Sequence, residues 1–240
     1  IGSGELEISG VLDALEGKFV SPGPSGAPSR GRPDVLPTGR NFYSVDTRTI
    51  PTPTAWKLGW KAAGLVLDRF CQENGEWPKN LLLSAWGTAN MRTGGDDIAQ
   101  VLALLGVCPE WEPMSGRVTG FKIIPYTALG RPRVDVTLRI SGFFRDAFPY
   151  QVELIDRAIQ RVAGLDEPEE FNPLAALAAA ERINLSSSGA NPETAFRRST
   201  ARVFGSKPGA YGAGLQSLID EGIWETQEDF ATAYLKWGSF

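Results

Sequence analysis

A first polar segment, residues 86–97, gathers charged and hydrogen-bonding side chains around a Gly-Gly pair. It offers a cation, hydroxyls, an amide and two adjacent carboxylates, which together could bind a charged ligand. The ordinary alternative is that Thr93 or Asp96 only caps the helix that follows, where an acidic side chain complements the helix dipole. The candidate residues of this segment are Thr88, Asn90, Arg92, Asp96 and Asp97.

A second segment, residues 141–149, places aromatic rings beside the adjacent Arg145 and Asp146. A flat conjugated ligand could lie against Phe143 and Phe144 while Arg145 pairs with one of its carboxylates. The alternative is that these rings are ordinary core residues.

A third segment, residues 204–214, is rich in glycine and contains Lys207. Its backbone N–H groups and the lysine could receive carboxylates, although the segment could also be only a tight connector. The residue order matches neither GxxxxGK[ST] nor GxGxxG, so we do not expect this chain to bind a nucleotide.

The composition excludes several classes of site and partner. The 240 residues include no histidine, which removes Ser-His-Asp and Cys-His catalysis and HExxH zinc sites. A formal net charge of −4 argues against binding to nucleic acid or to an anionic membrane. Cys71 and Cys108 lack CxxC spacing, which indicates that both are thiols in a protein of the reducing cytoplasm. No apolar run could span a bilayer, so we expect a soluble, cytoplasmic protein.

Predicted strands place the first two segments at one edge of a sheet. Residues 81–84 are predicted to form a short buried strand, residues 134–140 another, and residues 118–124 a third. In an open α/β sheet, ligands bind beyond the carboxyl ends of the strands. The first two segments follow directly after two of these strands, so we expect a ligand-binding edge there.

Helical spacing and capping residues predict the remaining elements. Thr54 is the expected cap of a first helix that ends near Asn74, and Gly106 is the expected stop of a second helix. The apolar face of the first helix is predicted to be Leu58, Ala62, Leu65, Val66 and Phe70, and that of the second Ile98, Val101, Leu102 and Leu105. Loops are expected over 22–39, 87–95 and 142–148, and a helix over 150–162. Further helices are expected to start at Asn172-Pro173 and Asn191-Pro192. Another helix should contain Leu215, Leu218 and Ile219, and the last should begin with a capping box from Thr226 to Asp229.

This alternation predicts an α/β fold: a mainly parallel sheet with helices on both faces, plus an α-rich C-terminal part. We expect an N-terminal segment with a Pro/Gly-rich loop over residues 1–40, an α/β domain over 41–165 and a helical region over 166–240.

Four long strings resemble the large subunit of aerobic-type cobaltochelatases. They are LPTGRNFYSVD (36–46), WGTANMRTGGDDIAQ (86–100), GRPRVDVTLRISGFFRDAFP (130–149) and VFGSKPGAYGAGLQSLID (203–220). The resemblance runs over essentially the whole chain in the order of the family, whose members are several times longer, so the chain resembles an internal piece. Magnesium-chelatase large subunits share GRPRVDV and a GxFRD-like string, whereas the TGGDD and FGSKPGAYGAGLQ forms resemble the cobalt enzyme.

The resemblance implies a tetrapyrrole-binding subunit that inserts Co²⁺ into hydrogenobyrinic acid a,c-diamide in aerobic cobalamin biosynthesis. It implies an AAA+ ATPase partner that hydrolyses ATP and a partner subunit of the metal-binding type. Cobalt would be a substrate, and no bound cofactor is expected in this chain.

The resemblance also implies roles for the candidate side chains. Asp96 becomes the first candidate for base and transient metal ligand, followed by Asp97 and Asp146. Thr88 and Asn90 would contact the substrate. The cations Arg92, Arg145 and Lys207 would pair with its peripheral carboxylates, and Phe143 and Phe144 would flank the ring or support the loop.

Two alternatives stay open at this point. Relatives are expected to use histidine, which this sequence lacks, so the isolated chain should be inactive and could be only a cradle for the tetrapyrrole or a docking module for a partner. The other alternative keeps the family but makes the chain a relative of magnesium chelatase.

Overall fold

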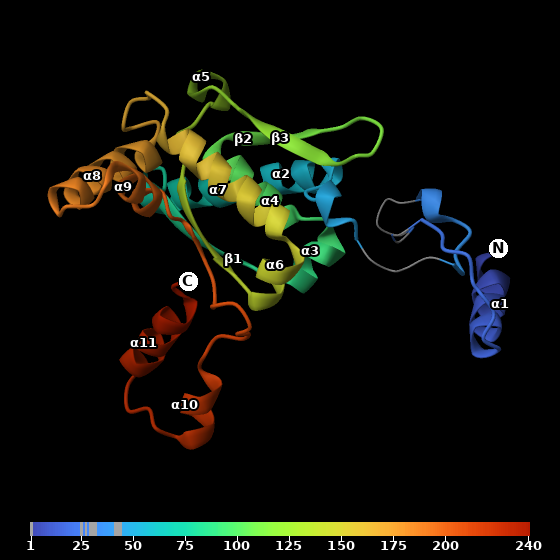
Figure 1. Cartoon of the computed structure of the whole chain (residues 1–240). Coiled ribbons are helices and arrows are strands. Elements are labelled where there is room, and N and C mark those ends of the chain that lie inside the picture. The colour runs from blue at the N-terminus through green and yellow to red at the C-terminus, as the bar shows by residue number, and fades with distance from the viewer. Residues whose placement is uncertain (1, 25, 27, 29–32, 41–44) are drawn as a thin grey trace.

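A small parallel sheet lies at the centre of the computed structural model, which describes residues 2–24, 26, 28, 33–40 and 45–240 (Figure 1). The strand order is β1-β4-β5, and both neighbouring pairs run parallel. The α/β class with a parallel sheet is therefore confirmed. The strands are β1 (Asn80–Ala85), β4 (Asp135–Ile140) and β5 (Val203–Phe204).

The strand expected over 118–124 exists but does not join this sheet. It is β3 (Val118–Ile123), and it pairs antiparallel with β2 (Val107–Trp111), a strand that the sequence did not reveal. A short turn links the two, in which the Glu112 N–H donates to the Arg117 carbonyl at 2.8 Å. Parallel strands need a crossover of a dozen residues or so, and a link this short permits only an antiparallel pair.

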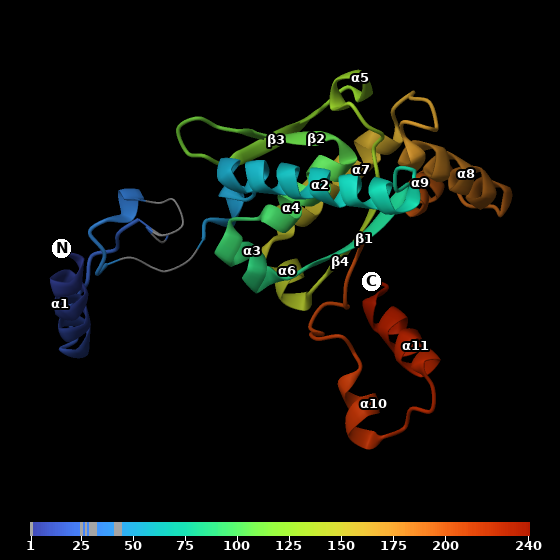
Figure 2. The same cartoon turned by 180° about the vertical axis from the view of Figure 1, so that it is seen from behind.

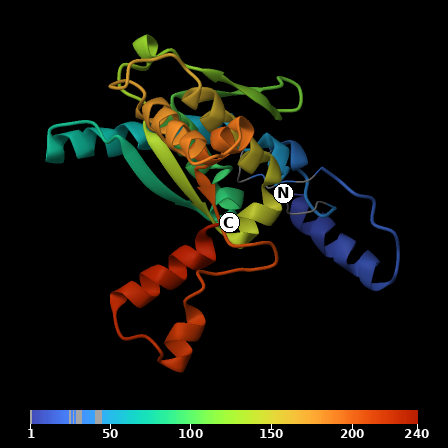
Figure 3. The same ribbon diagram turned by 60° about the vertical axis from the view of Figure 1, so that its left-hand side comes forward.

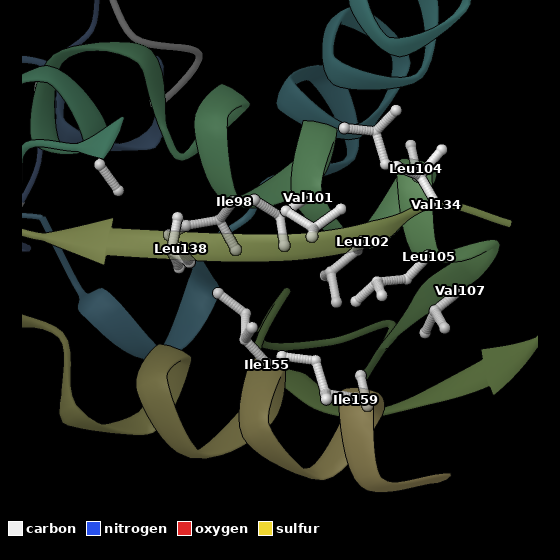
Figure 4. Packing of buried hydrophobic residues seen from close by; sticks show 14 of the residues in the cluster. Ile98, Val101, Leu102, Leu104, Leu105, Val107, Val134, Leu138, Ile155 and Ile159 are labelled. Carbon is white, nitrogen blue, oxygen red and sulfur yellow. The ribbon is translucent and has the colours of Figure 1, made fainter. Parts of the chain in front are cut away.

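Helix α4 (Asp96–Leu105) is buried on almost every side. Its predicted apolar face is confirmed, and Ala99, Ala103 and Leu104 are buried as well. The reason is that α4 packs between the sheet, the β2–β3 hairpin, α2 (Pro53–Asn74) and α7 (Pro149–Ala163). Figure 4 shows Ile98 of α4 beside Leu138 of β4, with Ile155 of α7 facing them.

Helix α2 turns a different face inward from the one predicted. Its cap is Thr52, whose Oγ1 accepts the Ala55 N–H at 3.1 Å, and not Thr54. The buried residues are Ala55, Gly59, Ala63 and Leu67, whereas Leu58, Leu65 and Val66 are exposed. Small residues face α4 because the two helices lie so close that a Cβ on Gly59 would come within 2.6 Å of the Ala99 Cβ (Figure 2).

Two predicted loops are short helices. The run after β1 forms α3 (Gly87–Thr93), and the run after β4 forms α6 (Gly142–Ala147). Ser141 caps α6 by accepting the Phe144 N–H at 3.1 Å. Gly94 and Gly95, with φ of 76° and 93°, end α3 and allow α4 to start at the next residue. The expected loop is therefore confined to these two glycines.

A fully buried arginine joins four parts of the fold. The Arg133 guanidinium is 0% exposed, and each of its five N–H groups has an acceptor. Two go to Glu167, at 2.7 and 2.8 Å. Three go to the carbonyls of Leu105, Gly106 and Ile124, at 2.9, 3.0 and 2.7 Å. Arg133 thereby fixes the end of α4, the end of β3, the entry to β4 and the segment that follows α7.

Neighbours of Arg133 extend this arrangement. Burial raises the pKa of Glu167, but hydrogen bonds from Arg133 and Asn172 more than offset it, so the pKa is lowered. Arg131 donates to the carbonyls of Ala103 and Leu104 at 2.6 and 3.4 Å, and burial, with a contribution from Arg133, lowers its pKa to about 10. The two arginines of the string GRPRVDV therefore donate hydrogen bonds to the carbonyl groups at the carboxyl end of α4.

The C-terminal part is helical, as predicted, and its predicted caps are confirmed. Asn172 accepts the Ala175 N–H, Asn191 accepts the Thr194 N–H, and Thr226 with Asp229 forms the capping box. The buried pair Arg202–Asp135, with distances of 2.8 and 3.1 Å, anchors β5 to β4. The helices here are α8 (Pro173–Ser187), α9 (Pro192–Ser199), α10 (Gln216–Glu221) and α11 (Gln227–Gly238).

The two ends of the chain extend from the central layers. Helix α1 (Ser3–Leu15), which the sequence did not predict, buries none of its residues, and α10 and α11 project on another side (Figure 3). Three further short elements are α5 (Tyr126–Leu129) and the 3₁₀ turns at Pro33–Val35 and Thr47–Thr49. Parts of the predicted loop at 22–39 and residues 41–44 of the first matching string lie outside the described residues. Among the described residues, no helix is long and apolar enough to cross a membrane.

Replacing Arg133 with Met should lower the free energy of unfolding by about 3–5 kcal/mol, because Glu167 would then be left as a buried charge without its partner. Urea denaturation followed by circular dichroism measures this. The control is Arg69→Ala, which breaks an exposed pair with Glu73 and should change the same quantity by less than about 1 kcal/mol. Equal losses in the two variants would contradict the role given to Arg133.

Replacing Gly95 with Ala should destabilise the chain more than replacing Gly75 with Ala. Both residues have positive φ, 93° and 77°, so both variants carry backbone strain of about 1 kcal/mol. Only at Gly95 would the new Cβ also overlap Cγ2 of Ile50, whereas nothing lies within 4 Å at Gly75. Thermal unfolding of both variants measures the difference, and equal midpoints would show that the Gly95 backbone can shift freely.

Candidate functional site

The carboxyl ends of β1 and β4 bring the first two polar segments together. The strands pair in register from Asn80 with Asp135 to Ala85 with Ile140, and each continues into a short helix, α3 or α6 (Figure 1). The Ser141 Oγ links the helices, because it accepts the Gly87 N–H at 3.4 Å besides capping α6. The two segments therefore form a shared surface at this edge, and ligand binding there stays a prediction.

Arg145 brings the third segment to the same edge. Its Nη1 donates to the carbonyls of Ser206 and Lys207, both at 2.7 Å. Ser206 closes the loop by donating to the Ala210 carbonyl at 2.6 Å. We refer to residues 86–97, 141–146 and 205–211 together as the strand-end site.

Arg145 is already engaged within the protein. Besides the two carbonyls, it forms a two-point ion pair with Asp146, at 2.8 and 3.0 Å. Asp146 also accepts the Tyr211 hydroxyl at 2.7 Å, and the hydrogen bonds from Arg145 and Tyr211 lower the Asp146 pKa. In this arrangement Arg145 holds the loop, and Asp146 is a weaker proton acceptor than an ordinary aspartate.

The carboxylates of Asp96 and Asp97 lie at the start of α4 in different surroundings. Asp96 Oδ1 accepts the Asp97 N–H at 3.0 Å, and Thr93 Oγ1 accepts the Asp96 N–H at 3.3 Å. These contacts are those of the capping alternative, so part of the polarity here serves the helix start. The Asp97 carboxyl is half-buried; burial, followed by the nearby Asp96 charge, raises its pKa.

Asn90 connects Asp97 to the end of β1. Its side chain is 0% exposed, and Nδ2 donates to the Trp86 carbonyl at 3.0 Å and to Asp97 Oδ2 at 3.1 Å. Its Oδ1 has no hydrogen-bond partner among the described residues. Asn90 is thus placed to orient the Asp97 carboxyl, and its buried side chain does not offer the direct substrate contact expected from the sequence.

The remaining candidates divide into exposed and buried side chains. Thr88, Arg92 and Lys207 are exposed at the strand-end site, whereas Phe144 is fully buried and stacks on Phe148 with ring centroids 5.0 Å apart. Phe144 therefore supports the segment and does not offer a face to a ligand. Phe143 remains 40% exposed.

Two aromatic residues at this edge were not among the predicted site residues. Trp86 and Tyr211 are 58% and 59% exposed. A large aromatic side chain directly after a strand, within a polar segment, is the sequence signal that could have identified Trp86. With Phe143, they give the strand-end site apolar surface of the kind that a flat conjugated ligand needs.

A resident metal centre is not formed within the described residues, which contain no group of three or more His, Cys, Asp or Glu side chains placed to hold an ion. Asp96 could thus supply one ligand to a metal that arrives as a substrate, and the other ligands would come from the macrocycle, water or other protein segments.

Comparison with known proteins identifies the family. The family model described as CobN/Magnesium Chelatase matches residues 1–240. The chain is 61% identical to a Sinorhizobium protein named aerobic cobaltochelatase subunit CobN, over 99% of this chain and 19% of that protein. It is 37% identical to the chloroplastic magnesium-chelatase subunit ChlH of rice, over 98% of this chain and 16% of that protein.

A solved structure agrees with these relatives. The catalytic subunit of cobaltochelatase from Mycobacterium tuberculosis superposes with a TM-score of 0.81 at 52% identity, covering 98% of this chain and 19% of that one. The chain thus spans about a fifth of the length of the proteins it matches. The match of the family model to every residue, together with these identities, shows that the chain belongs to the CobN/magnesium chelatase family.

Proposed function

We propose that this chain forms part of the tetrapyrrole-binding, metal-inserting region of a cobaltochelatase, a ligase that places Co²⁺ in hydrogenobyrinic acid a,c-diamide during aerobic cobalamin biosynthesis. The observation that carries the proposal is the 61% identity to a cobaltochelatase subunit over 99% of the chain. The identity to a magnesium-chelatase subunit is much lower, 37%, which favours cobalt over magnesium as the substrate metal.

The strand-end site supplies groups that this reaction needs. Insertion of a divalent ion requires the metal to lose water, the ring N–H groups to lose protons and the macrocycle to be held in place. The exposed rings of Trp86, Phe143 and Tyr211 provide apolar surface for a flat macrocycle. Lys207 and Arg92 lie exposed at the same site, where they can meet peripheral carboxylates.

In this proposal Asp96 and Asp97 have different roles in proton transfer and metal binding. The raised pKa of Asp97 makes it the better proton acceptor, because a general base works best when its pKa approaches the working pH. Asp96, at the first turn of α4 beside Asp97, is the transient ligand or first base for a metal or proton at the surface. Asn90 is a positioning residue, since it holds Asp97 through its Nδ2.

The complete reaction would need groups beyond this chain. ATP would be hydrolysed by an AAA+ ATPase partner, and a subunit of the metal-binding type would complete the cytoplasmic complex. Within the described residues no cluster of three potential metal ligands exists, which favours an inactive isolated chain. The same observation supports the alternative that this region only cradles the tetrapyrrole or docks a partner while catalytic groups lie elsewhere.

Replacing Asp96 with Asn in the full subunit should lower the rate of cobalt insertion by about 10²–10⁴-fold, the range typical of a lost acid–base group. Binding of hydrogenobyrinic acid a,c-diamide, followed by visible absorbance, should change little. Asp68→Asn on the exposed side of α2 is the matched control and should keep full activity. Unchanged turnover in the Asp96 variant would remove Asp96 from the mechanism and favour the cradle alternative.

Replacing Asp97 with Asn should make the chain more stable at neutral pH and leave its stability nearly unchanged in acid. Because the folded state raises the Asp97 pKa, the unfolded chain releases this proton first, and ionisation opposes folding as the pH rises from the unfolded pKa through the folded pKa. Asparagine cannot ionise, so the difference in free energy of unfolding should grow from about pH 4, the ordinary aspartate value, and become constant above the folded pKa. We expect less than about 1 kcal/mol because the group is partly solvated. A difference independent of pH, measured by urea denaturation, would contradict this.

A further inference from the structure

The two faces of the parallel sheet differ in how they are covered. On one face Val136, Leu138 and Ile140 of β4 are buried under α4. On the other face Leu82 of β1 is 67% exposed, and α11 lies on that side of the strands (Figures 1 and 2). Parallel sheets are normally covered on both faces, so this open face is incomplete in the chain as it stands.

A continuous groove runs along the open face. Two hollows, of about 800 Å³ and 330 Å³, share Leu82, Thr137, Phe204 and Ser239 in their walls. Leu177 of α8 and Leu235 of α11, both exposed, line the two ends. The smaller hollow is lined mainly by apolar surface, whereas the larger one combines apolar side chains with charged residues, and helices on either side of the strands contribute to both.

The margin of the groove carries unbalanced positive charge. Arg202 is neutralised by Asp135 and lies 3.8 Å from Glu181. In the described part of the chain, no ion pair involves Arg139 or Arg198, which both line the groove. Arg139 donates to the Ile140 carbonyl at 2.6 Å and lies against the ring of Tyr234, so it is engaged within the chain. Arg198 is exposed, and an occupant that carries carboxylates beside an apolar surface would pair with it.

We propose that the open face docks an amphipathic helix, apolar on one side and acidic at its margin, from the rest of the same full-length subunit. Helices cover sheet faces, whereas strands add to sheet edges. In the relatives this region is only 19% of the chain, so most of the subunit is tethered to it. A tethered segment has a high effective concentration at the groove, so it outcompetes a separate molecule that presents a similar binding surface. The proposal concerns assembly of the subunit and holds whichever metal is inserted.

Cysteine labelling in the full-length subunit tests the docking. In a background with Cys71 and Cys108 replaced by Ser, Leu82→Cys and Thr137→Cys should react with a maleimide at least about ten-fold more slowly in the folded, isolated monomer than in the same variant unfolded in urea. Two positions are used so that one poorly folding variant does not decide the result. Labelling as fast as in the unfolded protein would overturn the proposal. Protection that appears only at high protein concentration, or only with the ATPase present, would also overturn it, because the occupant would then be a second copy or a partner.

The identity and charge of the occupant are tested by cross-linking and charge reversal. A photoreactive amino acid at Leu177 should cross-link within one subunit to a helix whose flanking residues include Asp or Glu. Arg198→Glu should speed labelling of Leu82→Cys several-fold, whereas Arg182→Glu, an exposed residue of the same region that does not line the groove, should not. Cross-links to another subunit, or no difference between the two reversals, would contradict the proposed occupant.

Discussion

The carbonyl groups at the carboxyl end of α4 lie inside the core, and they must find hydrogen-bond donors there because water does not reach them. Arg133 and Arg131 provide those donors from the segment that enters β4. A guanidinium can satisfy several carbonyls and a carboxylate at once because it carries five N–H donors, more than any other side chain. The positive charge also lies at the negative end of the helix dipole. The position of β4, the link after α7 and the hairpin all depend on this contact.

The same helix carries the candidate site at its opposite end. Because α4 is enclosed along its length and held at its carboxyl end, its first residues, Asp96 and Asp97, have little freedom to move relative to β1 and β4. A catalytic or binding group is most effective when a rigid element holds it. The arginines of GRPRVDV thus act on the strand-end site from the far side of the core, through the helix between them.

The sequence predicted the elements with strong local signals. Helix starts at Asn172 and Asn191, the stop at Gly106 and the strands β1 and β4 were visible because capping residues and apolar runs act locally, whereas the two-residue β5 was not predicted. The inward face of α2 was not predictable, since close packing against α4 selects small residues over large ones at Gly59.

In the site, residue types located the edge of the sheet, but the partners of each side chain depend on tertiary contacts. The pairing of Arg145 with Asp146 and with distant carbonyls, and the burial of Phe144, follow from how α6 meets the loop at 205–211. No spacing in the sequence reports contacts between segments some 60 residues apart. The roles of Asp96 and Asp97 in metal insertion stay predictions, because they depend on contacts with a substrate and a metal that neither the sequence pattern nor the fold reports.

The way Arg145 holds the loop has an evolutionary consequence. Its hydrogen bonds to Ser206 and Lys207 end on main-chain oxygens, which every amino acid provides. The lysine side chain is left exposed and is not required for the path of the backbone. Replacement at position 207 can therefore change the charge of this surface while the loop keeps its course, so related chains could differ in charge there without rebuilding the fold.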